Sequence, residues 1–113
     1  MATPIEKLVF LLDELVQLLS CTKDPYDVAI AKRLDWTRAT RQRLVSSSSD
    51  VEMSEILQEI RVALRGGMGS FLDLYLYPHP DCGMSELEMN ARFERLVNTI
   101  FSTAVQQLTN KDT

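Results

Sequence analysis

The sequence is poor in the residues that usually carry catalytic or metal-binding chemistry. Its 113 residues include one histidine, two cysteines and one tryptophan. Two cysteines are too few for a disulfide framework, so Cys21 and Cys82 are expected to remain free thiols in a reducing compartment. A zinc site normally needs three or four protein ligands, and the sequence offers no such set. We therefore expect no metal, no cofactor and no catalytic residue.

The sequence also lacks the patterns that direct a chain to or through a membrane. No apolar run reaches the ~20 residues of a membrane span. At the amino terminus, Glu6, Asp13 and Glu14 interrupt the apolar stretch that a secretory leader would need. We therefore expect a cytoplasmic protein that does not associate with a membrane.

Charge excludes another class of function. The net charge is −4 and the pI is near 4.9, which opposes general nucleic-acid binding and favours a basic partner. Basic residues are concentrated between residues 32 and 43. Ion pairs with acidic residues of neighbouring helices, or exposure to solvent, account for this concentration without a nucleic-acid partner. No nucleic-acid partner is therefore predicted.

The sequence does contain four segments with apolar residues at helical spacing, over about 3–20, 26–45, 50–65 and 85–108. Thr3-Pro4 and Asp24-Pro25 are typical helix starts, and Ser49 and Ser85 each open a capping box. Tyr26 is expected on the buried side of the second helix. The length and the 45% hydrophobic content suit a single domain covering residues 1–113. The predicted fold is all-α, a compact bundle of about four amphipathic helices.

The connection between the third and fourth helices is unusual. Three of the four glycines lie together, at Gly66, Gly67 and Gly69, and they predict a turn that ends the third helix. Residues 71–77 alternate like a strand but have no second strand to pair with. We expect a short helical turn there that passes into extended chain, followed by a rigid proline-containing loop over 78–83.

Two short stretches allow an alternative function. His79, Asp81 and Cys82 bring an imidazole, a carboxylate and a thiol together. The turn over residues 66–70 could offer N–H groups to a phosphate, but it follows a helix and lacks the lysine of a phosphate-binding loop. A small enzyme or ligand-binding domain that uses the Gly66–Ser70 turn and the His79–Cys82 loop therefore stays open as an alternative.

Residues 66–74 read Gly-Gly-Met-Gly-Ser-Phe-Leu-Asp-Leu. This stretch resembles the motif Gly-Gly-Met-Gly-Ser-Phe-x-Asp-Leu of a family of small bacterial helical domains, and the helical layout and chain length agree with it. The resemblance implies a small standalone cytosolic protein, and some proteins of this kind are immunity proteins that neutralise a toxin used in competition between bacteria. It implies no catalytic residue.

An immunity protein needs a stable scaffold and a complementary surface. We predict that this chain binds and occludes a cognate protein toxin, encoded by the adjacent gene. The candidate contact residues, chosen by residue type, are Phe10, Trp36, Phe71, Asp73, Tyr75 and Tyr77. Of these, Phe10 lies off the apolar stripe of its helix, whereas Trp36 is expected mainly to pack against the core. A homo-oligomeric adaptor that uses the exposed aromatic residues, for example as a homodimer, is a further alternative.

Overall fold

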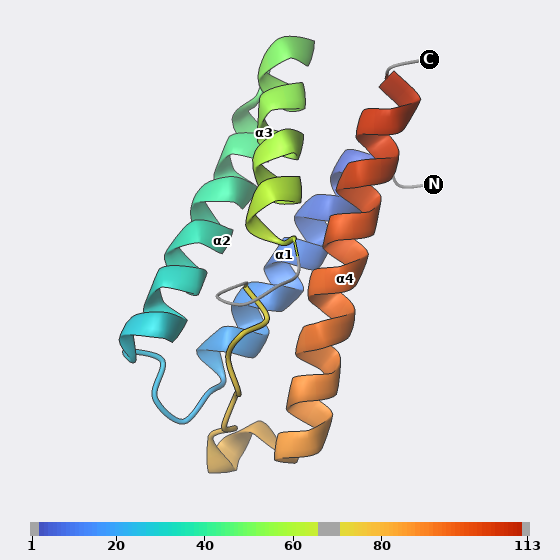
Figure 1. Ribbon diagram of the computed structural model, residues 1–113. Coiled ribbons are helices and arrows are strands. Elements are labelled where there is room, and N and C mark those ends of the chain that lie inside the picture. The colour runs from blue at the N-terminus through green and yellow to red at the C-terminus, as the bar shows by residue number, and fades with distance from the viewer. Residues whose placement is uncertain (1–2, 66–70, 112–113) are drawn as a thin grey trace.

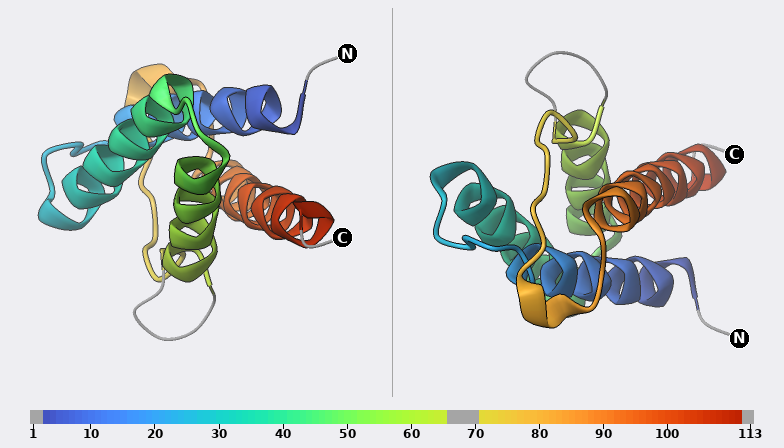
Figure 2. Two further views of the ribbon diagram at one scale, coloured as in Figure 1. Left: turned by 90° about the horizontal axis from the view of Figure 1, so that it is seen from above. Right: turned by 90° about the horizontal axis from the view of Figure 1, so that it is seen from below.

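The computed structural model describes residues 3–65 and 71–111, which form a helical bundle (Figure 1). The elements in these ranges are α1 (Pro4–Ser20), α2 (Val28–Ser46), α3 (Asp50–Ala63), the short 3-10 helix η1 (Pro80–Cys82) and α4 (Glu86–Lys111). Successive α-helices run in opposite directions. Helix α1 packs against both α2 and α4, and α3 packs against α4 (Figure 2). The predicted all-α bundle of four helices is confirmed, and none of the helices described is long and apolar enough to cross a bilayer.

Side-chain caps begin three of the α-helices where the sequence predicts them. The hydroxyl oxygens of Thr3, Ser49 and Ser85 accept hydrogen bonds from main-chain N–H groups three residues further on, each at 3.1 Å. These bonds satisfy donors that a helix cannot satisfy itself. At its other end α4 continues to Lys111, beyond the expected end at residue 108.

Helix α2 begins later than expected. The main-chain oxygen of Asp24 accepts a hydrogen bond from the N–H of Asp27 at 3.2 Å, which closes a turn around Pro25. Asp27 then caps the helix by accepting from the N–H groups of its second and third residues. The prediction that Tyr26 lies on the buried side is therefore wrong, because Tyr26 belongs to the turn and its side chain is 90% exposed.

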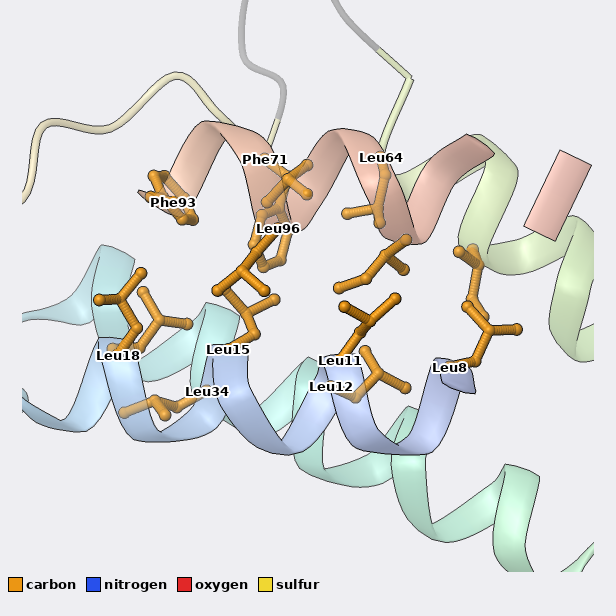
Figure 3. Packing of buried hydrophobic residues seen from close by; sticks show 14 of the residues in the cluster. Leu8, Leu11, Leu12, Leu15, Leu18, Leu34, Leu64, Phe71, Phe93 and Leu96 are labelled. Atoms are coloured by element: carbon orange, nitrogen blue, oxygen red, sulfur yellow. The ribbon is translucent and has the colours of Figure 1, made fainter. Parts of the chain in front are cut away.

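All four α-helices contribute to the core, with the most buried side chains coming from α1 and α4. Figure 3 shows leucines of α1 pointing toward Phe93 and Leu96 of α4, with Leu64 and Phe71 completing the cluster. The buried face of α1 is wider than predicted, because Leu11 and Leu18 join the expected stripe. Each fully buried side chain of this size stabilises the fold by about 1.5–3 kcal/mol relative to an exposed one.

Basic side chains of α2 pair within the molecule. Arg41 forms an ion pair with Asp13 of α1, and Arg43 forms one with Glu59 of α3. The hydrogen bond with Glu59 raises the pKa of Arg43. All four side chains are partly exposed, so each pair contributes no more than about 1 kcal/mol.

Helix α3 is shorter than its neighbours and ends partway along the bundle (Figure 1). Residues 71–79, called the 71–79 segment below, continue from there to η1 at the far end. The chain turns at residues 71 and 72 and again around Asp73, where the Leu74 N–H donates to the Leu72 carbonyl at 2.8 Å. These turns stand where a short helical turn was expected, and the segment is extended beyond them. Gly66, Gly67 and Gly69, which we predicted to form the turn after α3, lie outside the described residues.

Cys21 and Cys82 form a disulfide bond, which contradicts the predicted free thiols. They are 61 positions apart in the sequence, so neither their number nor their spacing predicted that they would bond to each other. The fold brings them together because Thr22 pairs with Pro78 in an antiparallel bridge, beside a hydrogen bond of 2.9 Å from the His79 N–H to the Cys21 carbonyl. The resulting Cα separation of 6.0 Å lies in the usual range for a disulfide.

Candidate functional site

The 71–79 segment begins with a side chain that belongs to the core. Phe71 is only 8% exposed, and its ring lies 5.4 Å from the ring of Trp36 and 6.0 Å from that of Phe93. Arg33 of α2 donates a hydrogen bond from Nε to the Phe71 carbonyl at 2.8 Å and covers the ring at 5.5 Å. Phe71 is therefore a packing residue rather than the predicted contact residue. Trp36 is half-buried against the same core, as expected.

Further along, two groups from other elements hold the main chain of the segment. The side-chain amide of Asn90 in α4 accepts the Leu76 N–H on Oδ1 at 2.8 Å and donates from Nδ2 to the Leu76 carbonyl at 2.9 Å. This amide takes the place of a neighbouring strand. The main-chain N–H of Lys23 donates to the Tyr77 carbonyl at 2.7 Å. The extended chain is thus fixed from both edges.

The side chains of Tyr75 and Tyr77 project outward from this fixed backbone. They are 51% and 54% exposed, and their rings meet edge to face with centroids 5.1 Å apart. The Tyr75 hydroxyl donates to Glu86 at 3.3 Å. Partial desolvation and the nearby Glu86 carboxylate raise the pKa of Tyr75 above its ordinary value.

A groove of about 710 Å³ opens beside the two tyrosines. Its walls come from the turn after α1, the start of α2 and the 71–79 segment. We call it the tyrosine groove, and its lining residues are Thr22, Lys23, Asp24, Asp27, Ile30, Leu74, Tyr75 and Tyr77. Apolar side chains and carboxylates therefore face the same opening.

Carboxylates outnumber cations around the tyrosine groove. Its charged lining residues are Asp24, Asp27 and Lys23. Next to lining residues, Glu86 accepts the Tyr75 hydroxyl, and Arg33 interacts with Asp73 and Asp27. Arg33 is turned toward the main chain, since its second nitrogen also donates to the Ala29 carbonyl at 3.0 Å. Burial lowers the pKa of Arg33, and the charges of Asp73 and Asp27 act in the opposite direction. The surroundings of the groove are thus negative, like the chain as a whole.

Four of the six predicted contact residues belong to this region, and two of those four, Tyr75 and Tyr77, are exposed aromatic residues that line the groove. Asp73 lies on the same segment beside Arg33. Phe10 is 61% exposed but does not line the groove, because it belongs to the first half of α1. The structure therefore divides the six candidates: Tyr75 and Tyr77 line the groove, Phe71 and Trp36 pack against the core, and Phe10 is exposed elsewhere on α1.

The alternative site at His79 has a structural role in this fold. Its Nδ1 accepts a hydrogen bond from the Asp81 N–H at 3.1 Å and caps η1. As long as the disulfide with Cys21 is intact, the Cys82 sulfur is not available as a thiolate nucleophile. Over residues 3–65 and 71–111, no group of three His, Cys, Asp or Glu side chains could hold a metal ion. The Gly66–Ser70 turn lies outside these ranges.

Sequence reasoning missed the residues that position the site. Asn90 could have been found from the sequence. It is a polar residue beside Met89 and one helical turn before Phe93, at the edge of the apolar stripe of α4, where a polar side chain needs a hydrogen-bond partner. Nothing in the sequence relates Lys23 to Tyr77, since their contact joins parts of the chain that are far apart.

No protein-family model, curated protein or solved structure matches this chain. The resemblance of residues 66–74 to a bacterial family therefore stays a prediction. The functional proposal that follows depends on the geometry of the 71–79 segment and the tyrosine groove.

Proposed function

We propose that this chain is an immunity protein that binds a cognate antibacterial toxin and blocks its active site. The observation that carries this proposal is the pair of exposed tyrosines, Tyr75 and Tyr77, beside an acidic groove. Tyrosine gives a large contact area and a hydroxyl for hydrogen bonding, and it loses little conformational entropy on binding. Such residues often supply most of the energy of a protein interface.

The way the tyrosines are held also supports a binding function. Bonds from Arg33, Asn90 and Lys23 fix the main chain of the segment before any partner arrives. A preformed surface lowers the ordering cost of association. The negative surroundings of the groove would steer a basic toxin surface toward it and accelerate association.

The proposed compartment is the cytoplasm, although the disulfide is more typical of oxidising compartments. The hydrogen bonds from Arg33, Asn90 and Lys23 to the segment involve no sulfur atom, so we expect the reduced protein to keep the groove. Alkylation of thiols in intact cells tests the compartment. If Cys21 and Cys82 become alkylated in cells, the compartment is reducing. If the disulfide keeps both from being alkylated, the proposed cytoplasmic location is contradicted.

The function is tested by co-expressing the chain with the product of the adjacent upstream gene. We expect growth to be restored and the two purified proteins to form a stoichiometric complex. The double substitution Tyr75→Ala and Tyr77→Ala should weaken this complex by about 100-fold, as expected for interface residues that each contribute at least ~1–2 kcal/mol.

Phe10→Ala is the matched control, because it removes an equally exposed aromatic side chain outside the groove. It should leave binding and growth unchanged. No complex with the toxin would remove the proposal, and a loss confined to Phe10→Ala would move the interface to α1. If light scattering showed a dimer that depends on the two tyrosines, the groove would instead be the binding site for a second copy of the chain.

A further inference from the structure

We infer that the partner enters the tyrosine groove as an extended, basic segment that pairs with the main chain of Tyr75. This inference rests on the proposed function and specifies how the toxin is recognised. Three features of the molecule support it: the main chain of Tyr75 has no hydrogen-bond partner among the described residues, the tyrosine groove opens next to it, and carboxylates line the groove.

The unpaired edge follows from the hydrogen bonds of the segment. In extended chain, successive residues direct their N–H and C=O groups to opposite edges. Leu76 uses both of its groups toward Asn90, so Tyr75 and Tyr77 present theirs to the other edge. There the Tyr77 carbonyl accepts from Lys23. Among the described residues, no hydrogen bond reaches the N–H or the C=O of Tyr75.

The opening exists because the chain after Lys23 turns away from the segment. Pairing between the two stretches stops at Lys23, and the turn around Pro25 then leads into α2. The tyrosine groove lies between this turn and Tyr75. An extended peptide in this position would continue the pairing that Lys23 begins. Addition of a strand to an open edge is a common mode of peptide recognition.

The groove favours a basic occupant over an acidic one. Asp24 and Asp27 form one wall, opposite Leu74 and the two tyrosines, while Ile30 is buried beneath. A lysine or arginine side chain could place its apolar stem against Ile30 and Leu74 and its charge beside the carboxylates. An acidic side chain would meet like charge and gain no such contacts.

The test selects random short peptides, displayed on phage, against the whole protein. We expect enrichment of extended sequences with lysine or arginine between β-branched residues. The double variant Asp24→Asn and Asp27→Asn should bind a selected peptide about fivefold more weakly, as expected for two partly exposed ion pairs. Asparagine keeps the oxygens that cap α2 and the turn, so the fold is retained.

Glu55→Gln with Glu94→Gln is the control, because it removes the same charge from exposed positions outside the groove. It should change the affinity little. Hydrogen exchange followed by NMR then tests the main-chain contact. We expect the Tyr75 amide to exchange at least about tenfold more slowly in the peptide complex. The Leu76 amide, already bonded to Asn90, should change less.

Several outcomes would overturn the inference: no enrichment of basic peptides, equal weakening by both double variants, or unchanged exchange at Tyr75 in the complex. Failure of the proposed function is distinguishable from these outcomes. Neutralisation of the toxin without protection of Tyr75 would remove the inference and keep the function. Selection of basic peptides together with no toxin complex would keep this mode of recognition and remove the immunity function.

Discussion

Helix α3 and the 71–79 segment follow one another along the bundle, but they are held in different ways (Figure 1). Helix α3 satisfies most of its main-chain groups internally and buries Ile56, Leu57 and Ile60 through regular spacing. The segment buries only Phe71 and Leu76, and its main chain depends on groups from other elements.

This difference explains why the candidate site lies on the segment. A helix leaves unpaired main-chain groups only at its ends, so its outer face offers a partner side chains alone. Extended chain leaves one edge open wherever no neighbour covers it. Tyr75 combines such an edge with an exposed aromatic side chain, and no residue of α3 does so.

The largest expected effect comes from removing the aromatic side chain that anchors the segment. Phe71→Ala should reduce the free energy of unfolding by about 3–5 kcal/mol, similar to the ~2–5 kcal/mol expected for Ile60→Ala in α3. Chemical denaturation measures both. Tyr77→Ala is the control and should cost only about 1 kcal/mol, because its side chain is half-exposed and loses mainly the ring contact with Tyr75. If Phe71→Ala cost no more than Tyr77→Ala, the segment would be a linker and not part of the core.

Removal of the disulfide should have the next largest effect. Replacement of Cys21 and Cys82 by serine should lower stability by about 2–4 kcal/mol, because the bond closes a long loop and restricts the unfolded chain. Reduction of the wild-type protein should give a similar loss. Mass spectrometry after alkylation provides the check, since two reactive thiols in protein purified without reductant would contradict the bond.

A smaller loss is expected when the amide that holds the segment is removed. Asn90→Ala leaves the N–H and C=O of Leu76 without their partner and should cost about 1–3 kcal/mol. Hydrogen exchange at the Leu76 amide should accelerate as well. Asn98→Ala, an exposed asparagine on the same helix, is the control and should cost less than about 0.5 kcal/mol. Equal effects of the two substitutions would show that Asn90 does not anchor the segment.

The smallest effect concerns the protonation of Tyr75. Desolvation and Glu86 raise the pKa of Tyr75, so Glu86→Gln should lower it toward the ordinary value of about 10. The raised pKa favours the protonated phenol in the folded state. Its contribution to stability is therefore present below about pH 10 and is lost as the pH rises through the folded-state pKa. Absorbance titration of phenolate measures the shift, and Glu88→Gln should leave the curve unchanged.

Local signals in the sequence predicted the helices well and failed where two local signals competed. Thr3, Ser49 and Ser85 each cap a helix where expected, because a cap depends on neighbouring residues only. Asp24 and Asp27 are both capable caps near the start of α2. Asp24 closes the turn and Asp27 caps the helix, and the side chain of Tyr26 consequently faces solvent.

Predictions about single side chains were less reliable than predictions about helices. Residue type suggested Phe71 and Tyr75 equally as contact residues, yet the first is buried and the second is exposed. The alternation of extended chain separates such positions only when the side that faces the core is known. The buried side chain of Leu76 shows that side for the end of the segment, so its neighbours Tyr75 and Tyr77 face outward.

The sequence by itself determined an all-α protein of four amphipathic helices, because caps and apolar spacing act over a few residues. Only the tertiary structure decided the path of the 71–79 segment, the disulfide and the tyrosine groove. Each of these depends on contacts between distant parts of the chain, such as Cys21 with Cys82 and Leu76 with Asn90. Such contacts form only when packing of the helices has brought their partners together, so no local pattern records them.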